Sequence, residues 1–279
     1  MRGVVAALVA VLALTGCTVG TAVNPHSGRS GDAPADGDWL LPPAGATPDY
    51  QLGGAYDPAT EVGIVGRDRS ADPAADAYTI CYVNGFQTQP GELDTWDADL
   101  MLQRDGETVF DPDWPDEALL DTSTADRRDR IAAQIIPWIE GCADDGFAAV
   151  EFDNLDSYTR SDDVLSLDDN LALATLFVDA AHGAGLAAGQ KNAAEDATVL
   201  RDRAGFDFAV TEECAVFEEC DVYTAVYGEH VIDIEYSDEL PRSFAEMCTD
   251  AESPASMVLR DRDLVTPDDP AYVFETCGE

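Results

Sequence analysis

The sequence predicts a single α/β domain folded as a (β/α)8 TIM barrel, and three observations lead to this prediction. Short apolar or β-branched runs alternate with longer helical runs downstream of residue 48. The strand-length runs are numerous enough to close an eight-stranded barrel. No glycine-rich phosphate-binding sequence follows any of them, which argues against the dinucleotide-binding form of the alternative fold, an open doubly wound sheet.

The first 16 residues have the pattern of a secretory signal. Arg2 precedes an apolar stretch that is too short to span a bilayer, and the stretch ends in Leu-Thr-Gly-Cys, which resembles a lipobox. We therefore expect residues 1–16 to be a signal peptide and Cys17 to be the lipidated first residue of a bacterial lipoprotein. Such a protein is exported and held at the extracytoplasmic face of the cell membrane by its lipid. An ordinary signal peptide cut nearby and an uncleaved anchor are the alternatives.

A tether follows, and then the barrel domain. Residues 18–48 consist mainly of Gly, Pro, Ala, Ser and Asp with almost no apolar periodicity, which predicts a disordered linker over residues 17–47. The barrel domain is expected at residues 48–279. Its strands are expected at residues 51–52, 62–65, 78–83, 118–120, 148–152, 186–190, 208–211, 231–235 and 257–259.

The helices are expected between these strands. The first covers residues 124–143, with Thr124 as its cap and an isoleucine-rich buried face. The second starts at Ser166 or Asp168 and runs to about residue 183. Two shorter helices are expected near residues 194–204 and 241–249.

The charge balance excludes nucleic acid as a partner. The chain carries 15 basic and 56 acidic residues, a formal charge of −41, and Lys191 is its only lysine. Binding to a polyanion requires clustered cations, which are absent from this sequence. The apolar fraction of 46% supplies enough material for a sizeable core, so the acidity does not imply a disordered chain.

The cysteines indicate disulfides rather than a metal site. Apart from Cys17, the chain has six cysteines, and an exported chain with six typically forms three disulfides. Cys214 and Cys220 enclose a short loop and are the one pair that the spacing favours. There is no Cys-x-x-Cys motif, and the three histidines lie far apart in the sequence, so no metal or other cofactor is expected.

Acidic residues at strand ends are the candidate catalytic groups, because the active site of such a barrel lies at the C-terminal ends of its strands. Alternation along residues 149–153 directs Glu151 and Asp153 into the barrel. The same reasoning directs Lys191 inward at the end of the next strand. Two carboxylates beside one cation suit the cleavage of a glycosidic bond, which needs one carboxylic acid and one carboxylate.

Two further strand ends are acidic. Residues 231–236 alternate cleanly, which predicts that Asp233 and Glu235 face inward and that the isoleucines face outward. Glu212 shares a face with Phe208 and Val210, so an inward Glu212 is expected to need a break or bulge in its strand. No Gly-x-Ser-x-Gly motif is present, which argues against serine hydrolysis. Among the tryptophans, Trp138 is expected in the core, whereas Trp96 or Trp114 can stack on a sugar.

Four segments together, residues 146–156, 185–192, 206–220 and 231–236, resemble glycoside hydrolase family 114 in order and spacing. The resemblance covers residues 48–262. It implies a TIM-barrel enzyme of the endo-α-1,4-polygalactosaminidase type, which cuts galactosamine-containing polysaccharides. By resemblance, Asp153 is the catalytic aspartate and Glu212 the catalytic glutamate, on a strand that breaks at its end. The substrate-binding positions implied are Tyr82, Glu151, Asn154, Lys191, Asn192 and Glu235.

The sequence departs from the family in its aromatic segments. Residues 48–52 replace a tryptophan-rich segment, Val-Asn-Gly-Phe-Gln follows Tyr82, and Thr211 replaces a common asparagine. The reaction class is therefore more firmly indicated than the polysaccharide. Two other hypotheses remain open at this point, a non-catalytic carbohydrate-binding lipoprotein on the same barrel and hydrolysis of a different envelope polymer.

Overall fold

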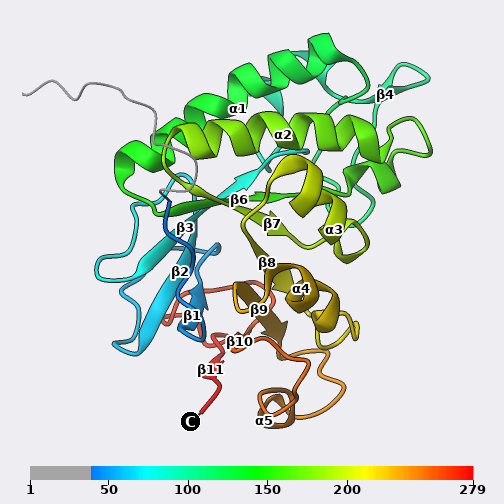
Figure 1. Ribbon diagram of the computed structural model, residues 1–279. Helices are drawn as coiled ribbons and strands as arrows, with labels where there is room; N and C mark the ends of the chain where they lie inside the picture. Colours follow the sequence, from blue (N-terminus) through cyan, green and yellow to red (C-terminus); the bar gives the residue numbers. More distant parts are fainter. Residues whose placement is uncertain (1–38, 279) are drawn as a thin grey trace, which may run out of the picture. The chain divides into compact units, whose positions relative to one another are not determined.

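Nine strands form one curved sheet in the computed structural model, which describes residues 39–278 (Figure 1). All neighbouring strands pair in parallel except the last, β11, which runs antiparallel to β10. The sheet is a nearly closed barrel, because β1 also lies beside β10. The order follows the chain: β1 Thr47–Tyr50, β2 Val62–Asp68, β3 Tyr78–Asn84, β6 Ala149–Asp153, β7 Ala187–Lys191, β8 Phe208–Glu212, β9 Val231–Tyr236, β10 Ser256–Arg260 and β11 Phe274–Thr276.

A buried arginine joins the first strand to the last parallel one. Arg260 of β10 is fully buried and pairs with Asp49 of β1, Nη1 to Oδ1, at 2.9 Å. The same nitrogen donates to the backbone carbonyl of Tyr50. A buried guanidinium is tolerated only when its hydrogens are matched by acceptors, and here they hold the two ends of the sheet together.

Two long helices cover one side of the barrel, α1 (Ala125–Asp145) and α2 (Leu167–Gly183), and pack against each other (Figure 1). Thr124 caps α1, and Ser166 opens α2 through a capping box with Asp169. Three short α-helices follow, α3 Ala197–Val199, α4 Cys220–Tyr227 and α5 Phe244–Met247. None of the helices within residues 39–278 is long and apolar enough to cross a membrane.

Alternation along the strands divides the core into two layers. One layer fills the inside of the barrel and includes Ile80, Phe208 and Ile234 from three different strands. The other lies between the strands and the helices and includes Phe152 of β6 and Phe177 of α2. Side chains of one strand therefore serve both layers in turn, as expected for a filled barrel.

The expected elements differ from the observed ones in several places. The first strand ends at Tyr50 instead of covering residues 51–52. Residues 118–120 form only isolated antiparallel bridges, because they belong to a long arm between β3 and α1. That arm also carries the two-stranded hairpin of β4 (Gln103–Arg104) and β5 (Glu107–Thr108). Helix α4 and strand β11 were not expected from the pattern.

Three disulfides join the six cysteines of the described chain. Cys81 of β3 bonds to Cys142 of α1, Cys214 bonds to Cys220, and Cys248 bonds to Cys277. The expectation that this chain forms disulfides is confirmed. The first of these bonds attaches α1 covalently to the barrel wall across a sequence separation of 61 residues.

The chain enters the fold at the N-terminal ends of the strands. Trp39 stacks on His182 at the end of α2, with ring centroids 3.6 Å apart. Tyr78, the first residue of β3, donates to the carbonyl of Leu40, and His230, just before β9, contacts the carbonyl of Pro42. The expected signal peptide, Cys17 and most of the expected tether lie outside the described residues.

Candidate active site

A pocket of about 630 Å³ opens at the C-terminal ends of the strands. Strand ends of β2, β3, β6, β7, β8 and β9 contribute to it, together with the loops that follow β1 and β10 and the arm between β3 and α1. Parallel strands bring their carboxyl ends to one edge, so polar residues distant in sequence meet there. The residues that carry charge or donate hydrogen bonds in this pocket are Asp68, Tyr82, Gln89, Asp111, Asp113, Trp114, Glu117, Asp153, Asn154, Asp156, Arg160, Lys191, Asn192, Glu212, Glu213, Tyr236, Arg262 and Asp263.

Three strands end in the same way. Asp153, Lys191 and Glu212 are the last residues of β6, β7 and β8. Each is followed by a residue with positive φ, Asn154 at 61°, Asn192 at 50° and Glu213 at 61°. A left-handed residue turns the backbone sharply and ends the strand, and for a glutamate it stores strain. The turn leaves the preceding charged side chain at the mouth of the barrel.

Asp153 is held by two donors. The hydroxyl of Tyr82 donates to its Oδ2 at 2.8 Å, and the backbone amide of Asn154 donates to its Oδ1 at 2.7 Å. Its side chain retains 19% exposure, so substrate can reach it. Two fixed donors orient a carboxylate without covering it, which suits a group that must approach a sugar carbon.

Glu212 accepts three side-chain hydrogen bonds. Lys191 Nζ lies 2.6 Å from Oε2, Asn192 Nδ2 lies 3.2 Å from the same oxygen, and the hydroxyl of Tyr236 donates to Oε1. Burial alone would raise the pKa of this carboxyl, but the ammonium of Lys191 and the hydrogen bonds outweigh it and lower the pKa below its usual value. The free protein therefore holds Glu212 as a carboxylate.

Lys191 lies between the two acids. Its Nζ is also 3.7 Å from Asp153 Oδ2, and the side chain is only 2% exposed. Burial lowers the pKa of a lysine, but the surrounding carboxylates of Asp153, Glu212 and Glu151 raise the pKa above its usual value. One permanent cation thus compensates the charge of the acidic cluster.

Glu151 lies deeper in the barrel than the other two acids and is fully buried. Its Oε1 accepts a hydrogen bond from the hydroxyl of Tyr50 at 2.9 Å, whereas Oε2 has no partner. Desolvation raises its pKa to about 8, despite the opposing effect of Lys191. Glu151 is therefore protonated at neutral pH and lies beneath the pocket without lining it.

The inward position of Glu212 corrects one expectation. No bulge or break is required, because Phe208, Val210 and Glu212 all face the inside of the barrel. The expectation assumed that apolar residues of a strand face the helices. The interior of a barrel is itself an apolar layer, so the acid at the strand end continues an apolar face.

The orientation expected for β9 is also wrong, for the same reason. Ile232 and Ile234 fill the inside of the barrel, whereas Asp233 and Glu235 face the outer layer. Asp233 accepts from the hydroxyl of Thr211 at 2.7 Å, and Glu235 accepts from the backbone amide of Ala215 at 2.8 Å. Both carboxyls are buried, and desolvation raises the pKa of each. Glu235 is thus placed away from the pocket and supports the loop after β8.

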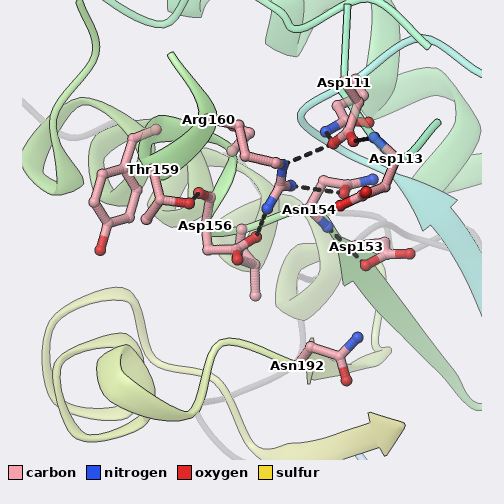
Figure 2. Close-up of polar contacts among 12 residues, drawn as sticks. Asp111, Asp113, Asp153, Asn154, Asp156, Thr159, Arg160 and Asn192 are labelled. Carbon is pink, nitrogen blue, oxygen red and sulfur yellow. Dashed lines mark hydrogen bonds and ion pairs between the residues drawn. The ribbon is translucent and has the colours of Figure 1, made fainter. Parts of the chain in front are cut away.

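An arginine missed in the sequence links the loop after β6 to the arm. Figure 2 shows Arg160 between Asp111 and Asp156, with Asn154 beside it. Its Nε lies 2.7 Å from Asp111 Oδ2, its Nη1 lies 2.9 Å from Asp156 Oδ1, and its Nη2 donates to Asn154 Oδ1 at 3.0 Å. Because the backbone amide of Asn154 donates to Asp153, Arg160 is connected to Asp153 through one residue. No local motif marks this arginine in the sequence.

The arm contributes two more pocket residues. Glu117 accepts from Asn84 Nδ2 at 2.9 Å, and its burial raises its pKa to about 7, aided by the charges of Asp153 and Asp111. Trp114 lines the pocket and is 62% exposed. Trp96, by contrast, is buried against Trp138, so it is a core residue and not a sugar contact.

One group of potential metal ligands lies close together in the part of the chain that the structure describes, Cys214, Cys220 and Asp233. The two cysteines are bonded to each other, so neither offers a thiolate. This group stabilises the loop after β8 and does not have the donors of a metal site.

Comparison with known proteins adds a family and two structural relatives. The sequence model of glycoside-hydrolase family GH114 matches residues 29–279. Ega3 of Aspergillus fumigatus, solved in complex with galactosamine, shares 21% identity and a TM-score of 0.68, with 86% of this chain and 100% of that chain covered. The glycoside hydrolase domain of PelA from Pseudomonas aeruginosa shares 11% identity and a TM-score of 0.56, with 84% and 99% covered. No curated protein matches the sequence. At these identities the two structures establish a common fold.

Proposed function

We propose that this protein, which belongs to glycoside-hydrolase family GH114 and is a glycoside hydrolase, cleaves internal bonds of a galactosamine-containing polysaccharide. The two residues that carry out the cleavage are Asp153 and Glu212. The observation that supports this most strongly is the position of Lys191, whose ammonium contacts both carboxylates at the mouth of the barrel. A binding protein has no need for two acids that share one buried cation. The bound galactosamine in the complex of Ega3 makes amino sugars the first substrates to test.

The roles follow from the contacts of each acid. Asp153 is oriented and partly exposed, and we assign it the attack on the anomeric carbon. Glu212 is assigned the proton transfers: it takes up a proton from solvent when the substrate binds, donates that proton to the leaving oxygen, and then accepts one from the attacking water. Tyr82, Asn154 and Asn192 line the pocket, and we assign them substrate contacts alongside their hydrogen bonds to the acids.

The geometry favours retention of the anomeric configuration. Asp153 Oδ2 and Glu212 Oε2 lie 3.7 Å and 2.6 Å from the same nitrogen. These two oxygens are therefore at most about 6.3 Å apart. The carboxyls of retaining glycosidases are roughly 5–5.5 Å apart and those of inverting ones roughly 6.5–9.5 Å, so we propose retention, with a covalent glycosyl intermediate on Asp153.

The charge of the pocket suits a cationic polymer. Most of the ionisable residues that line it are acids, and Arg160 and Arg262 are each already paired with two carboxylates. Free amino groups of a deacetylated sugar chain are protonated at neutral pH and gain favourable interactions there. An N-acetylated or anionic polymer lacks this attraction.

The test is incubation of the protein with purified galactosaminogalactan and related amino-polysaccharides, with mass spectrometry of the released oligomers. Wild-type protein should release galactosamine oligomers, and Asp153→Asn and Glu212→Gln should each abolish the release while the protein stays folded, as circular dichroism checks. Asp68→Asn serves as a matched control, since Asp68 lines the same pocket without contacting Lys191. Turnover retained in both catalytic variants would refute the assignment. Release from a different polymer alone would refute galactosamine polymers as the substrate but would still support glycosidic bond hydrolysis.

We also propose that the enzyme is a lipoprotein anchored through Cys17 at the extracytoplasmic face of the membrane. The six cysteines of the described chain are all bonded in pairs, which fits an oxidising compartment. The described chain starts at the barrel end opposite the pocket, so an upstream anchor leaves the pocket accessible to polymer. Labelling of cells with a radioactive fatty acid should mark the wild-type protein and spare Cys17→Ser. Equal labelling of both proteins would exclude this anchor.

A further inference from the structure

Trp114 has no structural role that explains its position. It is a large apolar side chain with 62% of its surface exposed, and it lines the pocket that contains Asp153 and Glu212. Exposing a tryptophan sacrifices the burial that usually stabilises a protein. Of the other tryptophans of the described chain, Trp39 stacks on His182, and Trp96 and Trp138 pack against each other. An exposed indole on a pocket wall is therefore available to a ligand.

The backbone that carries Trp114 is rigid. Asp111 Oδ1 accepts from the backbone amides of Asp113 and Trp114, at 2.9 Å and 3.2 Å. The amide of Glu117 closes the turn on the carbonyl of Trp114 at 2.9 Å, and prolines stand at positions 112 and 115. Fixed φ angles and a closed turn leave the backbone few alternatives. The turn thus holds the backbone that presents the indole in place before any ligand arrives, which lowers the entropy cost of binding.

The turn is fastened to the rest of the pocket. Asp111 Oδ2 accepts from Gln87 Nε2 at 2.7 Å and pairs with Arg160 at the same distance. The carboxylate of Asp111 is nearly buried, and although burial opposes it, these partners lower its pKa, so it stays ionised. The arm therefore cannot move away from the loop after β6 without breaking a buried ion pair.

A short series of hydrogen bonds connects Glu117, which lines the pocket beside Trp114, with Asp153. Glu117 accepts from Asn84, Asn84 accepts from Asn154 Nδ2 at 3.1 Å, and the amide of Asn154 holds Asp153. Two side chains thus separate Glu117 from the catalytic aspartate. Asp153, Trp114 and Glu117 line the same pocket, so neighbouring units of a polymer bound at Asp153 have Glu117 and Trp114 within the same cavity.

We propose that Trp114, flanked by Asp113 and Glu117, forms a separate sugar subsite that holds a galactosamine unit of the polymer beyond the unit cleaved at Asp153. This inference rests on the proposed function. The axial hydroxyl of a galacto-configured ring leaves its other face lined with C–H groups, which stack on an indole. The ammonium at C2 is attracted by the indole face and by Asp113 and Glu117, and its charge favours the ionised form of Glu117, whose pKa is otherwise raised to about 7. A uronic acid or a neutral sugar would satisfy only the stacking.

The experiment measures cleavage of α-1,4-linked galactosamine oligomers of increasing length by the full chain in detergent. For wild-type protein, kcat/KM should rise stepwise at the length that reaches the subsite. Trp114→Ala should remove the step, about a tenfold loss on long oligomers with no change on the shortest one cleaved. Trp114→Phe should keep most of the step. Phe217→Ala is the control, because Phe217 is similarly exposed at 64% but lies outside this pocket.

A second measurement separates the subsite from the chemistry. Calorimetric binding of a long oligomer to Asp153→Asn protein should weaken about tenfold when Trp114→Ala is added. If Trp114→Ala keeps the length step, or if it does not weaken binding of the long oligomer, the subsite is refuted and the proposed function stays in place. If wild-type protein cleaves no galactosamine oligomer and Asp153→Asn protein binds none, the proposed function and the subsite are both refuted. If neutral galactan oligomers show the same Trp114-dependent step, the amino-sugar assignment is refuted and only the stacking remains.

Discussion

Replacing Lys191 with methionine tests the electrostatic argument for the site most directly. Methionine preserves the length and much of the volume of the side chain but removes its charge. At 2.6 Å and an effective dielectric constant of about 20, the attraction between Lys191 and Glu212 is ~6 kcal/mol. Desolvation of two buried ions offsets much of it, and removing one partner of a buried pair typically costs about 3–5 kcal/mol. We expect a destabilisation of about 3 kcal/mol at pH 7.

The destabilisation caused by Lys191→Met should depend on pH. The pKa of Glu212 is lowered in the folded protein, so the stability it contributes is present above its unfolded pKa and is lost as the pH falls through the folded pKa. Without Lys191, Glu212 loses its counter-ion and its folded pKa rises. The difference between wild type and Lys191→Met should therefore be largest at neutral pH and should shrink below about pH 4.5.

Circular-dichroism melts between pH 4 and pH 7.5 measure this difference. A destabilisation of about 3 kcal/mol corresponds to a melting temperature lowered by roughly 6–12 °C at pH 7.5 in a domain of this size. The loss should be smaller at pH 4 than at pH 7.5. Arg203→Met is the control, because the ion pair of Arg203 with Asp168 is more than half exposed and should contribute less than about 1 kcal/mol. A loss that is the same at every pH would refute the reasoning.

Three further outcomes are expected. Arg160→Met should lower kcat about ten- to hundredfold with little change in KM, because Asp153 loses its orientation through Asn154; an unchanged kcat would disprove this. Glu151→Gln should gain stability relative to wild type as the pH rises from 4.5 through 8, because the raised pKa of about 8 makes ionisation of Glu151 costly in the folded state; pH titrations of unfolding check this. Serine replacement of the Cys81–Cys142 pair, which spans 61 residues, should cost about 4 kcal/mol, against about 2 kcal/mol for Cys214–Cys220, which spans 6; equal losses in denaturant titrations would contradict the loop-entropy argument.

Local sequence patterns predicted most of the strands and helices of the barrel. Helix α1 begins after Thr124 and helix α2 after Ser166, as their caps predict, because capping depends on residues within one turn. Strands β6 and β7 carry their inward residues at the expected positions. The structure of the arm between β3 and α1 could not be predicted from local patterns. Residues 118–120 form bridges to residues 87, 101 and 110, which are distant from them in the sequence.

The candidate site was predicted in part. Asp153, Lys191 and Glu212 meet at one edge because parallel strands align their ends, a consequence of fold class alone. Arg160 was missed, since an arginine in a loop has no signal until its acceptors Asp111, Asn154 and Asp156 are brought around it. Trp114 was named only as one of two alternatives, and burial of Trp96 decides between them.

The sequence by itself determined the fold class and the inward positions of Asp153 and Lys191, because these depend on local alternation, and the family resemblance singled out Glu212. The tertiary structure decided which face of each strand is inside. In β8 and β9 both faces are buried, one in the barrel and one beneath the helices, so an apolar run has no polar side to mark its orientation. Only closure of the barrel placed Glu212 inside and Glu235 outside, and only the arm brought Trp114 and Glu117 to the pocket.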